Sequence, residues 1–100
     1  MAGFWEFPGG KCEAEETPTA CLVREIREEL GAGVAVGEEL YRTHYAYGRR
    51  LLELIFFTCT LQDEPQPLLG QEIRWVPRAL LGTLEFPPAD AELIERLAGL

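Results

Sequence analysis

Residues 17–31 hold the start, the apolar stripe and the end of one helix, and they constrain the fold more than any other segment. Thr17 followed by Pro18 is typical of a helix start, because threonine caps free N–H groups and proline loses no hydrogen bond there. Gly31 is typical of a helix end. Apolar residues recur between these ends at every fourth position: Leu22, Ile26 and Leu30. The pattern predicts an amphipathic helix with one face in the core.

Acidic side chains gather beside the apolar face of this helix. At about 100° per residue, Glu25, Glu28 and Glu29 fall within roughly 100° of one another. Like charges at these spacings repel by roughly a few tenths of a kcal/mol per pair, so a compensating partner is expected. One interpretation is a solvated face on which Arg24 and Arg27 are the local partners. The other is a hard divalent cation such as Mg²⁺, bound by the carboxylate oxygens.

The residues ahead of the helix favour the cation interpretation. Gly9 and Gly10 precede the loop that leads into the helix. Backbone without a Cβ atom can approach a ligand closely and offer its carbonyl oxygens to a metal. Glu16, at the end of the same loop, adds another carboxylate.

The whole chain is expected to form a single α+β domain over residues 1–100. The other expected elements are a short strand at 4–7, a hairpin over 34–61 whose second strand is central in the sheet, a short strand at 72–76, a helical turn at 77–82 and an amphipathic helix over 88–97. The last helix would direct Leu93, Ile94 and Leu97 inward.

Charge and cysteine content exclude several classes of protein. A formal net charge of -8 repels nucleic acid duplexes and anionic membranes, so neither is expected as a partner. Three cysteines without a C-x-x-C pair, and a single histidine, indicate neither a disulfide framework nor a zinc site. This composition fits a reducing, cytoplasmic setting. No secretory leader and no long apolar span is evident.

The spacing of the polar residues resembles the signature of the Nudix hydrolases at every fixed position. The matching residues are Gly10, Glu16, Arg24, Glu25, Ile26, Glu28, Glu29 and Gly31. Ala32 departs from the pattern, since the family usually carries a larger aliphatic residue there. A smaller side chain should weaken packing without touching the chemistry.

The resemblance implies a fold, a cofactor and a set of site residues. The fold would be a mixed β-sheet between helices, an α/β/α sandwich. Glu25, Glu28 and Glu29 would bind Mg²⁺, for which Mn²⁺ could substitute, together with the Gly10 carbonyl. Glu16 would complete the acidic cluster, Arg24 would orient the carboxylates by charge-assisted hydrogen bonds, and Lys11 would meet the substrate phosphates.

Two further stretches, "FWEFPGGK" and "EFPPAD", are similar to the MutT-like subgroup of nucleoside triphosphate pyrophosphohydrolases, which includes enzymes acting on 8-oxo-dGTP. The resemblance implies hydrolysis of a nucleoside triphosphate to the monophosphate and pyrophosphate, in nucleotide-pool sanitation and DNA repair. Asp90 would contact the base and Phe4 would offer a stacking surface. An ionised aspartate only accepts hydrogen bonds, which favours a guanine-type edge. Asp90 equally suits the N-cap of the last helix, and pyrimidine substrates remain an alternative.

The sequence departs from the family pattern in two places. Leu69, ahead of Gly70 and Gln71, stands where many MutT-like members carry a further glutamate, which leaves the general base open. Relatives also carry strands ahead of "GFWEFPGG", so the chain is expected to be N-terminally truncated. An incomplete reading frame, a reduced variant or a homodimer that completes the sheet would each explain this. The alternatives to the main function are a Nudix hydrolase of another nucleoside diphosphate derivative and a catalytically weakened nucleotide-binding module.

Overall fold

The computed structural model describes residues 3–99, which form two compact units. One unit is the continuous segment Pro8–Ile73, and the other combines Met1–Phe7 with Arg74–Leu100. The helices of residues 3–99 are all too short or too polar to span a lipid bilayer.

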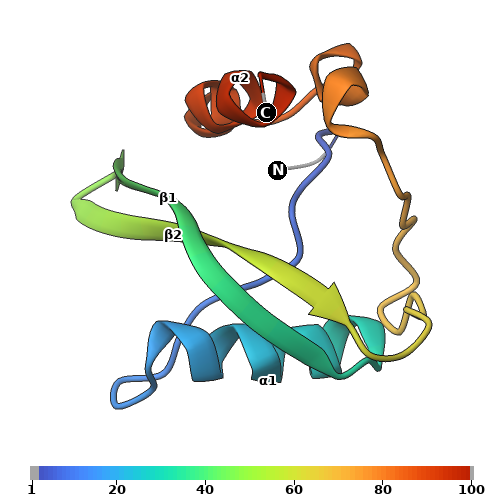
Figure 1. The fold of residues 1–100 in the computed structure, drawn as a ribbon. Coiled ribbons are helices and arrows are strands. Elements are labelled where there is room, and N and C mark those ends of the chain that lie inside the picture. Colours follow the sequence, from blue (N-terminus) through green and yellow to red (C-terminus); the bar gives the residue numbers. More distant parts are fainter. Residues whose placement is uncertain (1–2, 100) are drawn as a thin grey trace. The chain divides into compact units, whose positions relative to one another are not determined.

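Helix α1 (Pro18–Leu30) has the boundaries that the sequence predicts (Figure 1). The Thr17 hydroxyl accepts a hydrogen bond from the Ala20 N–H at 3.1 Å, which caps the first turn. Gly31 ends the helix in the left-handed conformation with φ 61°, and its N–H donates to the Arg27 carbonyl. Only glycine adopts this backbone conformation without steric cost, which explains why the helix stops there.

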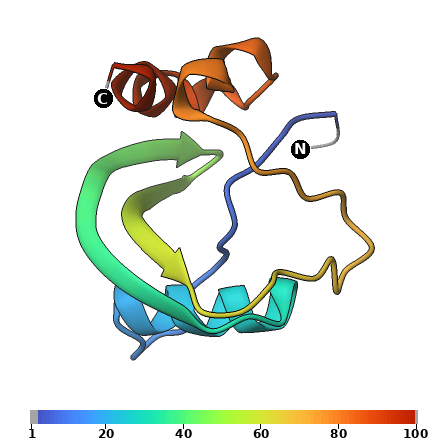
Figure 2. The same ribbon diagram turned by 45° about the vertical axis from the view of Figure 1, so that its right-hand side comes forward.

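A long antiparallel hairpin follows, made of β1 (Val34–Tyr47) and β2 (Arg50–Leu61). The register pairs Val34 with Leu61 at one end and is shifted around Glu39. A Cβ atom on Gly37 would lie 2.5 Å from the Thr58 hydroxyl, so this irregular stretch requires the close approach that glycine allows. Both strands bend strongly (Figure 2).

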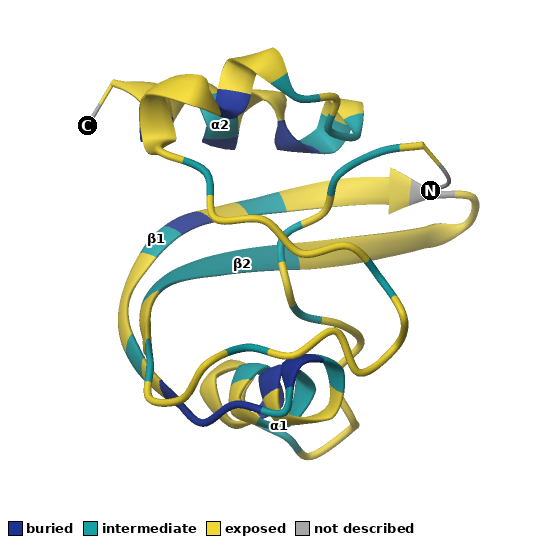
Figure 3. Cartoon of the chain, turned by 90° about the vertical axis from the view of Figure 1, so that its right-hand side faces the viewer, coloured by how far each residue is buried: buried dark blue, intermediate teal, exposed yellow. Residues whose placement is uncertain are grey.

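The core of this unit joins α1 to the start of β1. Its buried members are Ile26, Leu30, Ala32 and Val34, with Leu22, Val36 and Leu61 packed against them. Figure 3 shows the buried positions of α1 beside the buried segment that leads into β1. The apolar stripe of α1 therefore packs into the core and holds the helix in place. Its acidic face points toward solvent and the preceding loop.

The second unit contains three short helices: η1 (Arg78–Thr83), η2 (Pro88–Asp90) and α2 (Ala91–Ala98). Leu81, Leu93 and Leu97 are its buried apolar residues. The N-terminal segment is held to it by the Trp5 N–H, which donates to the Glu85 carbonyl at 2.7 Å, and by the stacked rings of Phe7 and Phe86.

The α+β class, the hairpin, the helical turn and the final helix are confirmed. The strands predicted at 4–7 and 72–76 are wrong, because both segments are irregular. The described residues contain one two-stranded sheet, so β2 pairs with β1 and is not a central strand there. Homodimerisation that completes the sheet stays a prediction.

Candidate metal and phosphate site

The loop ahead of α1 brings its backbone directly against the acidic face of the helix. A Cβ atom on Gly10 would lie 2.5 Å from one carboxylate oxygen of Glu25, a distance that real Cβ contacts do not reach. A side chain at this position would therefore push the Glu25 carboxylate aside, and glycine lets the loop approach the helix without doing so. Gly9 supports the same turn with φ 141°.

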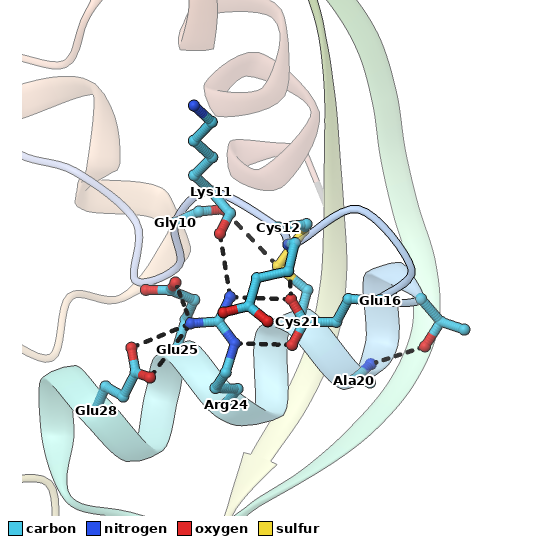
Figure 4. Close-up of a disulfide and its surroundings, with 11 residues drawn as sticks. Gly10, Lys11, Cys12, Glu16, Ala20, Cys21, Arg24, Glu25 and Glu28 are labelled. Carbon is cyan, nitrogen blue, oxygen red and sulfur yellow. Dashed lines mark hydrogen bonds and ion pairs between the residues drawn. A yellow bond between two sulfur atoms is a disulfide. The ribbon is translucent and has the colours of Figure 1, made fainter.

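Arg24 is the centre of the site and binds the loop through one side of its guanidinium group (Figure 4). Its Nε donates to Glu16 Oε2 at 2.7 Å, and its Nη2 donates to Glu16 Oε1 at 2.9 Å. This bidentate pairing is the strongest geometry available to arginine and a carboxylate. Nη2 also donates to the Lys11 carbonyl at 3.1 Å.

The remaining nitrogen of Arg24 binds the acidic residues of the helix itself. Nη1 donates to Glu25 Oε1 at 2.8 Å and to Glu28 Oε2 at 3.1 Å. The Glu25 side chain is 13% exposed and the Glu28 side chain is 57% exposed. Glu28 is therefore the carboxylate that is most accessible to a ligand from solvent.

Arg24 and Glu16 shift each other's pKa values. Hydrogen bonds from Arg24, and then from the Glu13 N–H, lower the pKa of the Glu16 carboxyl to about 2. The same contact with Glu16 raises the pKa of Arg24. Three carboxylates against one guanidinium leave two negative charges in the cluster. Arg24 thus offsets part of the repulsion along the helix, and the cluster keeps a negative charge that attracts a cation.

The donor set fits a hard cation. The carboxylate oxygens of Glu25 and Glu28 and the Gly10 carbonyl are oxygen ligands of the kind that Mg²⁺ and Mn²⁺ prefer. Glu29 lies on the next position of α1 and is half-buried. Its carbonyl accepts hydrogen bonds from the Leu68 N–H and from the Gln71 side chain.

Lys11 is exposed, and its side chain extends away from the carboxylates in Figure 4. Its backbone carbonyl accepts a hydrogen bond from Arg24, and its exposed ammonium group is the part of the residue that can meet an anion.

Leu69 is 70% exposed and belongs to the loop that a hydrogen bond from Gln71 ties to the end of α1. Gln71 therefore supports the helix end, a role that the sequence did not reveal.

A disulfide bond joins Cys12 in the loop to Cys21 on α1. The expectation that the cysteines form no disulfide is therefore wrong. Cys21 is 3% exposed, and its sulfur lies 3.9 Å from the Gly10 carbonyl oxygen. The odd number of cysteines hid the pair, because Cys59 is the free one.

Asp90 and Phe4 belong to the other unit. Asp90 is 9% exposed and stands at the N-cap of α2, but its side chain makes no cap hydrogen bond. Burial, and secondarily the negative charge of Glu6, raises the pKa of Asp90. Phe4 is half-buried. The capping interpretation of Asp90 thus has no hydrogen bond to support it.

Replacing Arg24 by glutamine should raise the pKa of Glu16 from about 2 toward its ordinary value of 4.5. A carboxyl whose pKa is lowered by folding stabilises the protein when the pH is above its ordinary, unfolded pKa. This stabilisation is lost as the pH falls through the pKa of the folded state. The metal-free wild type should therefore lose stability between about pH 4.5 and 2, and R24Q should lose less. NMR titration of the Glu16 carboxyl carbon and urea unfolding across this range measure both effects. Arg27→Gln on the exposed face of α1 is the control, and an unchanged Glu16 titration in R24Q would contradict the assigned cause.

Comparison with known proteins supports the family assignment. The model of the NUDIX domain family matches residues 1–96. An 8-oxo-dGTP diphosphatase of Haemophilus influenzae is 44% identical over 94 residues, which are 92% of this chain and 68% of that protein. A CTP pyrophosphohydrolase of Escherichia coli is 36% identical over 107 residues, which cover 100% of this chain and 75% of that protein. The solution structure of the E. coli ORF135 protein matches with a TM-score of 0.89 at 33% identity, over 100% of this chain and 72% of that one.

Proposed function

The chain belongs to the NUDIX domain family of hydrolases, and from this premise we propose that it hydrolyses a nucleoside triphosphate to the monophosphate and pyrophosphate in the cytoplasm. The observation that carries the proposal is the acidic cluster around Arg24, held against the backbone of Gly10. A merely solvated helix face would not need a glycine at a position where a Cβ atom would collide with the Glu25 carboxylate. Oxidised nucleotides such as 8-oxo-dGTP are the substrate class that we propose, because the H. influenzae relative is named an 8-oxo-dGTP diphosphatase.

The cluster would hold Mg²⁺ through the carboxylates of Glu25, Glu28 and Glu29 and the Gly10 carbonyl. When bound, the ion supplies charge neutralisation of the phosphates and a lowered pKa for the attacking water. The protein needs such help, because a net charge of -8 repels a polyphosphate.

The residues of the chain then have separate tasks. Arg24 holds Glu16 on the loop and Glu25 on the helix in one arrangement, so the oxygens are in place before a ligand arrives. The buried stripe of α1 keeps the helix from rotating. Lys11, with an exposed ammonium group, would bind the phosphate oxygens as they approach the loop.

Asp90 would recognise the base by hydrogen bonding. Its carboxyl is buried, is free of a capping role and has a raised pKa, so it keeps its proton to a higher pH than an exposed aspartate does. A protonated carboxyl donates as well as accepts hydrogen bonds, whereas the ionised form only accepts. Phe4, in the same unit, would provide a stacking surface.

Asp90→Asn should change base selectivity by about 10-fold, since one good hydrogen-bonded pair discriminates by roughly 1–3 kcal/mol. The variant should also be more stable than the wild type above pH 3.8. The protonated Asp90 carboxyl, whose pKa is raised by burial, contributes stability at low pH that is lost as the pH rises, and asparagine carries no charge. The ratio of kcat/KM for 8-oxo-dGTP and CTP measures the first effect, and thermal melts at pH 3 and 7 measure the second. Glu95→Gln, an exposed charge removal on α2, is the control. An unchanged ratio would remove Asp90 from base recognition.

A panel of ordinary and oxidised nucleoside triphosphates, nucleotide sugars and dinucleotides, assayed with Mg²⁺ for pyrophosphate or phosphate products, tests the proposal. Turnover of 8-oxo-dGTP with pyrophosphate release is the expected result. Faster turnover of CTP would favour the activity named for the E. coli relative. Tight nucleotide binding without product would instead support the weakened binding module that Leu69 suggests, and would overturn the proposed hydrolysis.

A further inference from the structure

The Cys12–Cys21 disulfide joins the loop of the candidate site to the N-terminal part of α1. It closes a ring over residues 12–21, which contains Glu16 and the helix cap Thr17. On one side of the ring, the Cys21 sulfur contacts the Gly10 carbonyl oxygen at 3.9 Å. On the other side, Glu16 is bound to Arg24 through both carboxylate oxygens. The bond therefore attaches the loop that carries Gly10 and Glu16 to helix α1.

The two cysteines differ in accessibility. Cys12 is exposed on the loop, whereas Cys21 is 3% exposed on the packed side of α1. A thiolate from solvent can therefore reach the Cys12 sulfur, and the Cys21 sulfur is the leaving group of that exchange. A second thiol of the attacking dithiol then releases Cys12. In total the disulfide gains two electrons and two protons and becomes two thiols, while the dithiol is oxidised to its own disulfide.

We propose that the Cys12–Cys21 pair is a reversible thiol–disulfide exchange site that sets the order of the Gly10–Glu16 loop. In the disulfide form, the loop is attached covalently to the core side of α1, and the Gly10 carbonyl and Glu16 are held in register with the helix. In the dithiol form, the loop is held by hydrogen bonds to Arg24 and within the loop, so it opens more readily. The inference about loop order does not depend on the proposed activity, but its effect on nucleotide hydrolysis does.

Hydrogen exchange on the full chain, without metal or nucleotide, tests the loop directly. The comparison uses the oxidised protein and the protein reduced with dithiothreitol, both in a Cys59→Ser background that removes the free exposed thiol. Reduction should expose two thiols, accelerate exchange of residues 10–16 by about 10-fold or more, and leave the β1–β2 hairpin unchanged. The melting temperature should fall by about 10 °C, given the usual effect of a short disulfide ring on a small domain.

Cys12→Ser separates the covalent bond from core packing, because it changes only the exposed cysteine. This variant should match the reduced protein in loop exchange and should not respond to dithiothreitol. Mn²⁺ affinity by titration calorimetry should fall in parallel in both. Equal loop exchange in the oxidised, reduced and Cys12→Ser proteins would overturn the proposal, as would failure of the purified dithiol to re-form the bond with oxidised dithiothreitol. Failure of the proposed hydrolysis would instead appear as no turnover in either form, with the exchange difference intact.

Discussion

Replacing Glu28 by glutamine is expected to lower kcat/KM by about 10³-fold or more, equivalent to about 4 kcal/mol in the barrier. Glu28 is the most exposed carboxylate that Arg24 binds, so it is the one best placed to bind a cation from solvent. Glutamine has the same shape and a similar helix propensity but carries no charge. The substitution should therefore remove ion binding and leave the helix in place.

Steady-state kinetics with Mg²⁺, circular dichroism and a thermal melt measure these effects in Glu28→Gln. The melting temperature should stay within a few degrees of the wild type, because an exposed substitution of this kind costs little. Glu95→Gln on α2 is the matched control and should retain full activity. Wild-type activity in a folded Glu28→Gln protein would remove Glu28 from the metal site.

Gly10→Ala should lower kcat/KM by about 10- to 100-fold, the usual cost of disturbing the residues that orient metal ligands. The added Cβ would lie 2.5 Å from a Glu25 carboxylate oxygen. That oxygen ends a flexible side chain, so the fold can accept alanine by moving the carboxylate away from Arg24. The loss should therefore appear in Mg²⁺ affinity and turnover, with little change in stability.

Gly82→Ala is the matched control for Gly10→Ala, since a Cβ at Gly82 meets nothing within 4 Å. Titration calorimetry with Mg²⁺ and kinetics on both variants give the comparison. If Gly10→Ala binds and turns over as the wild type does, the contact between the loop backbone and Glu25 has no role in the site.

Local chemistry made the helix and hairpin predictable. The Thr17 cap, Pro18 and Gly31 define α1 because each acts on the backbone next to it. The turn between β1 and β2 is likewise marked by Gly48, which has φ 62°. The acidic spacing on α1 predicted one face shared by Glu25, Glu28 and Glu29, and Arg24 binds Glu25 and Glu28 in the structure.

Features that need partners distant in the sequence were not predictable. The aromatic alternation at 4–7 satisfies the local pattern of a strand, but the Trp5 N–H donates to the carbonyl of Glu85, which lies in an irregular segment and not in a strand. Cys12 and Cys21 lie on a loop and a helix whose contact depends on how the loop folds back. The burial of Asp90, which raises its pKa, depends on packing within its unit.

We propose that the glutamates of α1 and the Gly10 carbonyl hold a divalent cation. Anomalous diffraction from crystals soaked in millimolar Mn²⁺ tests it most directly. We expect an anomalous peak beside Glu25 and Glu28 that is lost in Glu28→Gln crystals of the same form. A well-ordered wild-type loop and helix with no peak at these side chains would contradict it.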